Sequence, residues 1–375
     1  MRRTVSLRKT DIKLLIYCGC SLFAGLLVLL LSRQTGRFGE WYASHVFPAF
    51  LDTIGRFFSI APFSVFEVLL VALLVWLLVS IVYFLSLALV PRWRGMLKKA
   101  ATRALCMALA LVCSVFMMMS LMCNANFSRD ALSDLMGRQV AAPSKTDLFE
   151  LCQLLIEQLS ELEGEIPTDS SGFFTVENID VKSEARAAMK ALGAEEPLFS
   201  GYYPNPKPAF FSNFMSMAGI TGLFSPFTME ANYNKEAPGY QIPFAACHEL
   251  AHLKGFIRED EAGFIAFLAC MRSASAEFRY SGAMNALAYA LSAYSSVATA
   301  EEIFELRETA PRQALGDFMA GSLYWKRYDG KIRRIANHAN DGYLKANAQE
   351  DGVRSYGRMV DLLVAEYISK TPYYF

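Results

Sequence analysis

Three long apolar runs constrain this chain most, because each is long enough to cross a lipid bilayer. They cover residues 14–32, 68–90 and 104–128, and none contains a charged side chain. A membrane-spanning helix needs about 20 apolar residues. A buried core helix is the alternative for each run, and a cleaved secretory signal is the alternative for the first. The first run is too long for such a signal and lacks an Ala-x-Ala ending, so we predict three transmembrane helices.

The charges beside these runs predict the orientation of the protein. Residues 1–13 contain five basic side chains and one acidic one, and the loop 91–103 contains five basic side chains and no acidic one. The loop 33–67 is balanced, with three of each sign. Because basic loops stay in the cytoplasm, we expect a multi-pass cell-membrane protein with a cytoplasmic N-terminus. Three crossings then place everything after residue 128 outside the cytoplasm.

The remaining charges suggest two domains with different surroundings. Residues 1–128, the predicted membrane domain, hold 13 basic and 4 acidic side chains, whereas residues 129–375 hold 23 and 32. An acidic extracytoplasmic domain disfavours nucleic acid as a partner. The lipid bilayer and a peptide or protein substrate are the partners that we expect.

The pattern of residues 129–375 predicts a mainly helical fold. Apolar residues at helical spacing predict amphipathic helices at 145–163, which begins with a capping-box sequence, and at 180–192. Residues 219–233 mix glycine, threonine and aromatics, which predicts a strand or hairpin. After residue 243 the pattern is helical, with breaks such as Gly282. The predicted fold class is three transmembrane helices followed by a mainly α (α+β) domain with a small edge strand or hairpin.

The sequence HELAH, which begins at His248, carries the chemistry. Residues four apart lie on one face of a helix, so His248 and His252 can bind one metal ion. Glu249 is then placed beside a water held by that ion and can take its proton. Pro243 suits the first turn of this helix, and Gly255 suits the position after its end. Two histidines on one face by coincidence are the alternative, but the chain has four histidines in all, which makes a chance match rare.

A catalytic zinc site needs a third protein ligand, and the following segment offers three acids. Glu259, Asp260 and Glu261 stand in a row. Glu261 shares a helix face with Phe264 and Leu268, and a carboxylate on such a buried face must be paired or bound to metal. Periodicity therefore favours Glu261 as the third ligand. The alternative is that Glu261 is a surface acid stabilised by the helix dipole.

At this point the sequence resembles a known group of enzymes. HELAH followed by EDEAGFIAFL is similar to the gluzincins, the thermolysin-like clan of zinc metallopeptidases. The whole arrangement resembles a bacterial membrane family, domain of unknown function 3810. The resemblance implies a zincin-like domain with one zinc ion bound by His248, His252 and Glu261, and with Glu249 as general base. Gly263 departs from the pattern, since related motifs often have Asn after Glu-Ala.

The resemblance also implies where a substrate binds. In the clan, an edge strand beside the H-E-x-x-H helix pairs with an extended peptide, and residues 223–232 are the candidate. Phe224, Ser225 and Asn232 are then the expected substrate-binding residues, and an ordinary hairpin is the alternative. His338 and Tyr356 are the expected donors to the transition state. Tyr289 and Tyr294 are further candidates.

Together these features predict a membrane-anchored zinc-dependent metallopeptidase, a hydrolase that cleaves peptides or membrane-proximal proteins. The alternative is a membrane sensor or scaffold whose metallopeptidase-like domain binds a ligand without turnover. A transporter subunit is the weakest interpretation, because the three spans contain no internal ionisable residues that would form a path.

Overall fold

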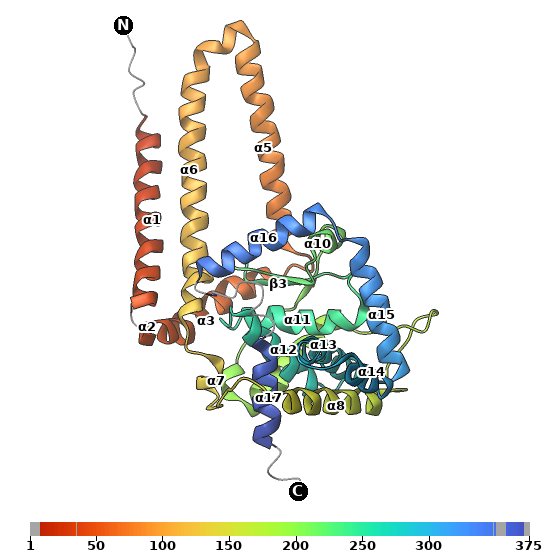
Figure 1. Cartoon of the computed structure of the whole chain (residues 1–375). Coiled ribbons are helices and arrows are strands. Elements are labelled where there is room, and N and C mark those ends of the chain that lie inside the picture. Colours follow the sequence, from red (N-terminus) through yellow and green to blue (C-terminus); the bar gives the residue numbers. More distant parts are fainter. Residues whose placement is uncertain (1–7, 35, 348, 350–357, 371–375) are drawn as a thin grey trace.

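Three long helices extend from one side of the protein (Figure 1). The computed structural model describes residues 8–34, 36–347, 349 and 358–370. The long helices are α1 (Lys9–Gln34), α5 (Val65–Leu89) and α6 (Leu97–Met122). Each is long and apolar enough to cross a membrane, and none of the most apolar window of α5 is buried inside the protein. Because so large an exposed apolar surface is unfavourable in water, the three helices indicate association with a membrane.

The three predicted runs coincide with these helices. The run 104–128 is α-helical as far as Met122 and continues as the 3-10 helix η4 (Asn124–Ser128). A second 3-10 helix, η3 (Pro91–Met96), joins α5 to α6 at the end far from the body of the protein (Figure 1). Helix α1 packs along α6, whereas α5 makes fewer contacts with α6.

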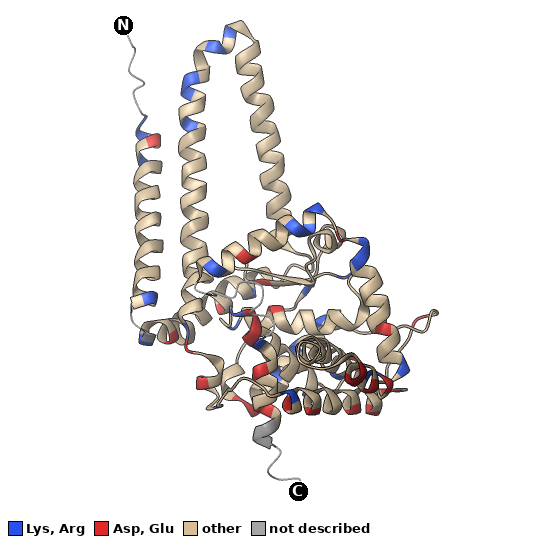
Figure 2. Ribbon diagram, in the orientation of Figure 1, with Lys and Arg blue, Asp and Glu red and all other residues tan. Residues whose placement is uncertain are grey.

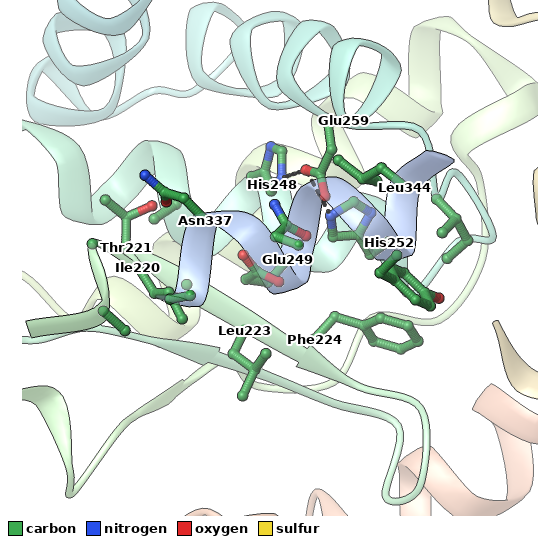
Figure 3. A pocket seen from close by; sticks show the side chains of 18 of the residues that line it. Ile220, Thr221, Leu223, Phe224, His248, Glu249, His252, Glu259, Asn337 and Leu344 are labelled. Atoms are coloured by element: carbon green, nitrogen blue, oxygen red, sulfur yellow. Dashed lines mark hydrogen bonds and ion pairs between the residues drawn. The ribbon is translucent and has the colours of Figure 1, made fainter. Parts of the chain in front are cut away.

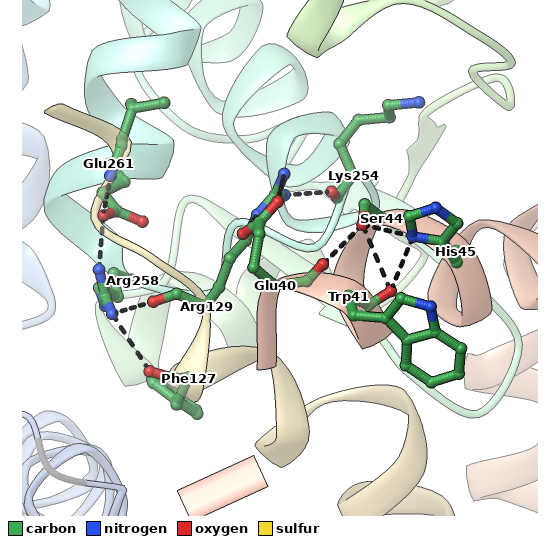
Figure 4. Close-up of polar contacts among 10 residues, drawn as sticks. Glu40, Trp41, Ser44, His45, Phe127, Arg129, Lys254, Arg258 and Glu261 are labelled. Atoms are coloured by element: carbon green, nitrogen blue, oxygen red, sulfur yellow. Dashed lines mark hydrogen bonds and ion pairs between the residues drawn. The ribbon is translucent and has the colours of Figure 1, made fainter. Parts of the chain in front are cut away.

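The chain between the first two long helices packs against the body of the protein. It forms α2 (Gly36–Trp41), η1 (Tyr42–Val46), α3 (Phe47–Phe50), η2 (Leu51–Gly55) and α4 (Arg56–Phe58). Phe47 and Leu51 are buried in the main hydrophobic core. Arg129 forms an ion pair with Glu40 at 2.9 Å (Figure 4). This segment therefore belongs to the packed body, and the division of the chain at residue 128 stays a prediction.

Helix α11 lies at the centre of a helical body. The helices are α7 (Leu132–Leu135), α8 (Lys145–Leu162), α9 (Val181–Glu195), η5 (Pro197–Phe199), α10 (Ser212–Ala218), η6 (Gly239–Gln241), α11 (Ile242–His252), α12 (Glu259–Met271), α13 (Ala276–Tyr294), α14 (Ala300–Glu308), α15 (Arg312–Arg327), α16 (Lys331–Ala346) and α17 (Met359–Lys370). Helix α11 packs against α9, α12, α13 and the sheet. All of its residues except His248 are buried, as expected of a helix that is apolar on every side.

A small three-stranded sheet covers α11. Its strands are β1 (Lys207–Pro208), β2 (Gly222–Ser225) and β3 (Glu230–Tyr233), in the order β1-β3-β2. Strand β3 pairs with β1 in parallel and with β2 in antiparallel fashion. The hairpin predicted at 219–233 is confirmed, and β2 is an edge strand beside α11.

Glu230 joins this sheet to the start of α5. Its carboxylate forms a buried ion pair with Lys207. It also accepts hydrogen bonds from the backbone N–H groups of Val65, at 3.1 Å, and Phe66, at 2.8 Å. These are first-turn N–H groups that have no partner within the helix, so a charged side chain of the sheet caps the N-terminus of α5, which is apolar enough to cross a membrane.

Two sequence predictions about helices have opposite outcomes. The predicted capping box of α8 is present, with Ser144 and Asp147 each bonded to the other's backbone N–H. The break predicted at Gly282 is wrong, because Gly282 lies inside α13. A Cβ atom at Gly282 would stand 2.7 Å from Cβ of Cys270. This glycine therefore permits the close approach of α12 and α13.

Candidate metal centre

Two imidazoles lie one turn apart on α11. Pro243 stands in the first turn of the helix, where its missing N–H has no cost. After the helix, Gly255 adopts a left-handed conformation with φ of 82°, which ends the helix in the usual way. The rings of His248 and His252 have centroids 4.6 Å apart and meet edge to face. Both side chains point toward α12 (Figure 3).

The third side chain of the cluster is Glu259, the first residue of α12. Its Oε2 atom lies 3.1 Å from Nε2 of His248 and 3.5 Å from Nε2 of His252. The three ligand atoms all lie within 4.8 Å of one another. Figure 3 shows the carboxylate between the two rings. The described part of the chain therefore contains a His-His-Glu group with the composition of a catalytic zinc site.

The structure contradicts the prediction that Glu261 joins the two histidines. Glu261 is buried, but its Oε1 atom accepts hydrogen bonds from the backbone N–H of Leu132 and from Nη1 of Arg258, both at 2.8 Å. Figure 4 shows Glu261 beside Arg258. An ion pair and a backbone hydrogen bond thus stabilise its buried charge. The periodicity argument failed because every residue of α12 from Glu261 to Cys270 is buried. The position of Glu261 on an apolar face therefore does not show that it faces α11.

The connection between α11 and α12 places Glu259. Only six residues separate the helices, and the left-handed Gly255 reverses the chain within them. The same turn brings the carbonyl oxygen of Phe256 to 2.7 Å from Nδ1 of His252. A protonated Nδ1 donates to that carbonyl and leaves Nε2 directed at Glu259. Metal-binding histidines are commonly held in this way by a backbone carbonyl.

The charges of the cluster are strongly coupled. Burial acts to lower the pKa of His252, but the charge of and hydrogen bond to Glu259, the charge of Glu249 and the hydrogen bond to Phe256 together outweigh it and raise this pKa to about 9. Burial acts to raise the pKa of Glu259, but the charge of His252 and hydrogen bonds from both imidazoles hold it well below its usual range. Burial lowers the pKa of His248. Without a metal ion, a protonated His252 therefore neutralises Glu259 at pH 7.

Glu249 lies beside the cluster and against the edge strand. It is buried, and a Cβ atom at Gly222 would stand only 2.4 Å from its Oε1 atom. Burial raises the pKa of Glu249 to about 8, while the charge of His252 and a hydrogen bond from the backbone of Phe224 act to lower it. A carboxyl group with a pKa near neutrality is suited to general acid–base catalysis.

These side chains face a cavity of about 840 Å³. Helix α11 and strand β2 form one side, and α13, α15 and α16 form others. Figure 3 shows Asn337 and Leu344 of α16 in front of His248 and His252. Phe66 and Met119, at the ends of α5 and α6, also line the cavity. The candidate centre therefore lies where the membrane helices meet the body.

Only one of the three predicted substrate-binding residues lines the cavity. Phe224 does so. Ser225 and Asn232 are buried away from it: Oγ of Ser225 accepts a hydrogen bond from Thr228, and Nδ2 of Asn232 donates to the carbonyl of Leu223. Substrate binding by any of the three residues stays a prediction, and the cavity favours only Phe224.

The predicted donors to the transition state have mixed outcomes. His338 is exposed on α16 and is not among the residues that line the cavity, and Tyr356 lies outside the described residues. Tyr294 is buried against Phe149. Tyr289 lines the cavity, and burial together with the charge of Glu259 raises its pKa to about 12. The sequence offered no means to prefer Tyr289 among 17 tyrosines.

The donor set fits a zinc ion. Ligands that surround zinc tetrahedrally at about 2.0 Å stand about 3.3 Å from one another, and the two distances from Glu259 to the imidazoles, 3.1 and 3.5 Å, bracket that value. The hydrogen bond that holds Nδ1 of His252 leaves Nε2 free to bind metal. His248, His252 and Glu259 are thus the residues that would hold the ion.

Comparisons with known proteins place the chain in a family but give no function. A family model described as "Protein of unknown function (DUF3810)" matches residues 42–364. No curated protein and no solved structure matches the chain.

Proposed function

This chain belongs to the family described as protein of unknown function (DUF3810), and we propose that it is a membrane-anchored zinc metallopeptidase with a zincin-like domain. One observation carries the proposal. The ligand atoms of His248, His252 and Glu259 lie within 4.8 Å of one another, and a further carboxylate, that of Glu249, lines the same cavity. A site that only binds metal for stability has no use for Glu249.

We assign each of these residues of the cavity a separate role in peptide hydrolysis. A bound zinc ion supplies a Lewis acid that polarises a carbonyl and acidifies water. His248, His252 and Glu259 hold and orient that ion. Glu249, in its ionised form, would accept the proton of the attacking water and pass it to the leaving amine. Tyr289 replaces His338 as the candidate that donates a hydrogen bond to the tetrahedral oxygen.

Strand β2 is the proposed binding site for the peptide backbone. It is the edge of the sheet and runs beside Glu249, which packs against Gly222. An extended peptide can add to such an edge through main-chain hydrogen bonds, while pockets select its side chains. Phe224, which lines the cavity, is placed to contact one of those side chains.

The charge distribution supports an extracytoplasmic catalytic domain. Basic side chains gather at the ends of α1, α5 and α6 that lie far from the body (Figure 2). Those ends belong to the N-terminal segment and the loop 91–103. Because basic loops remain in the cytoplasm, we propose that the body faces the outside of the cell membrane. A reporter fused after residue 375 should then be active outside the cytoplasm.

The test of catalysis is Glu249→Gln in the full chain, purified in detergent. Wild-type protein should contain one zinc ion per chain and cleave members of a mixed peptide library. The variant should keep its zinc and lose cleavage by about 10²- to 10⁴-fold, the usual contribution of a general base. Cleavage at the wild-type rate would contradict the role of Glu249.

The test of the metal ligands compares Glu259→Gln with Glu261→Gln. These variants make the same change two residues apart in the first turn of α12. The first should release zinc, because an amide is a poor substitute for a carboxylate ligand. The second should keep zinc and lower only the stability, because it weakens the contacts with Arg258 and Leu132. Loss of zinc from Glu261→Gln alone would overturn the assignment.

A sensor or scaffold that binds ligand without turnover is the second candidate. The capping of α5 by Glu230 favours it, because this contact couples a membrane helix to the sheet beside the cavity. A wild-type protein that retains zinc, binds peptides and cleaves none of them would support this candidate over the peptidase.

A further inference from the structure

We propose that the body of this protein embeds part of its own surface in the outer interface of the bilayer. The surface in question, here called the embedding face, consists of exposed apolar side chains from the segment before α5, from α10 with the turn before it, and from α16. They are Phe57, Ile60, Phe63, Phe210, Phe214 and Ile335. The inference concerns how the body meets lipid and does not depend on the proposed catalysis.

The level of α10 relative to the membrane is fixed by its contact with α5. The carboxylate of Glu67, in the first turn of α5, accepts hydrogen bonds from the backbone N–H groups of Phe210 and Phe211, at 2.8 and 2.9 Å. The first turn of a spanning helix lies at the boundary between lipid and water. Phe210 and Phe214, which are 77% and 62% exposed, therefore stand at that boundary.

Helix α16 continues the same surface. It packs against α10 and lies across the side of the body from which the long helices extend (Figure 1). One face of α16, which includes Ala336, Asn337 and Asn340, lines the cavity. Ile335 points elsewhere and is 69% exposed. Because the cavity lies on the inner side of α16, the exposed side faces the membrane.

The charges of α16 suit a lipid surface. The helix carries exposed Lys331, Arg334 and Lys345, with Asp341 as its one acid, while Arg333 lies on the face that lines the cavity. Figure 2 shows basic side chains along the course of α16, on the side of the body nearest the long helices. A basic amphipathic helix with exposed aliphatic side chains is typical of a helix that lies in the interface plane. Basic side chains near the surface are attracted to anionic headgroups.

The occupant of the embedding face is the bilayer because the face is continuous with the membrane helices. Phe63 and Ile60 directly precede the cap of α5, and Phe210 is bonded to its first turn. If α5 spans the bilayer, lipid surrounds it up to the level of its first turn. Apolar side chains placed there gain by entering the acyl boundary, to a depth of about 5–10 Å.

The embedding face also bears on the substrate, a point that rests on the proposed function. Because the inner face of α16 lines the cavity while its outer face meets lipid, the cavity adjoins the membrane surface. The substrate class is then a polypeptide segment that lies on the bilayer.

The test places a fluorescent label at single cysteines in the full chain. Among the eight cysteines, Cys20 is the exposed one, so the background carries Cys20→Ala. The label is attached at Phe214→Cys or Ile335→Cys. The controls are Phe304→Cys, an equally exposed phenylalanine on α14 at 64%, and Val297→Cys, an exposed aliphatic residue at 51%. Each protein is reconstituted in phosphatidylethanolamine–phosphatidylglycerol vesicles that contain a lipid with a shallow acyl spin label.

The spin label should quench the fluorescence at positions 214 and 335 and leave that at 304 and 297 unchanged. Equal quenching at 214 and 304 would overturn the proposal. Disulfide cross-linking of two copies through position 214, without quenching, would also overturn it, since the face would then be a dimer contact. A zinc-free but quenched protein would refute the peptidase and leave the embedding face intact.

Discussion

Replacing Gly222 by alanine tests whether the position of Glu249 matters. The new Cβ atom would lie 2.4 Å from Oε1 of Glu249 and 2.7 Å from its Cγ. Ordinary contact begins near 3.4 Å, so the carboxylate must move by about 1 Å. A displacement of about 1 Å in a catalytic group can cost about 10²-fold in rate. Because the three atoms nearest to the new methyl group all belong to Glu249, we expect the proposed zinc ion to stay bound.

Gly263→Ala is the matched control, since it adds the same methyl group to a buried glycine of α12. There the nearest atom is Sδ of Met359 at 2.9 Å, the far part of a flexible side chain that can turn aside. Overpacking should cost either variant about 1–3 kcal/mol in stability, which a thermal melt in detergent would measure. Peptide cleavage and zinc content should separate them, with cleavage lost only in Gly222→Ala. A zinc-loaded Gly222→Ala protein that cleaves at the wild-type rate would refute the role given to Glu249.

Three further results are expected. Tyr289→Phe should keep zinc and slow cleavage by about 10²- to 10³-fold if the hydroxyl stabilises the oxyanion, and an unchanged kcat would exclude that role. Zinc must displace a proton from His252, because the charge of Glu259 helps to raise the pKa of this histidine to about 9. Zinc affinity, measured by competition with a chelator, should therefore fall about tenfold per pH unit below pH 9. An affinity that is constant from pH 6 to 9 would contradict this. Glu230→Gln should cost about 3–5 kcal/mol because it leaves the buried charge of Lys207 with the carbonyl of Phe58 but without its counter-ion. Lys207→Met in the same chain should recover part of the lost thermal stability.

Features that depend on neighbouring residues in the sequence were predictable. The capping box of α8 depends only on Ser144 and Asp147. The long helices could be predicted from the length of their apolar runs. The pair of imidazoles follows from a spacing of four on a helix. The hairpin could be located from its composition, but its register could not, because the same residues suit either face until the partner strand is fixed. The composition therefore could not show that Phe224 lines the cavity and that Ser225 and Asn232 do not.

Features that depend on how elements approach one another were not predictable. Glu259 and Glu261 stand in the same turn, and only the direction of the six-residue connection decides which carboxylate meets the histidines. A buried carboxylate can be satisfied by metal or by arginine, and the sequence alone does not reveal that Arg258 fills the second role. Gly282 shows the same limit, since a glycine that ends a helix and one that lets two helices touch look alike in a sequence.

The cap that Glu230 places on α5 has a mechanical consequence. Strand β2, which lies beside Glu249, pairs with β3, and β3 carries the Glu230 carboxylate that caps α5, a helix apolar enough to cross a membrane. A bilayer of different thickness changes the tilt of such a helix. Tilting α5 must then either turn the sheet with it or break the bonds to Val65 and Phe66. Through this contact, the lipid composition of the cell would affect the shape of the cavity.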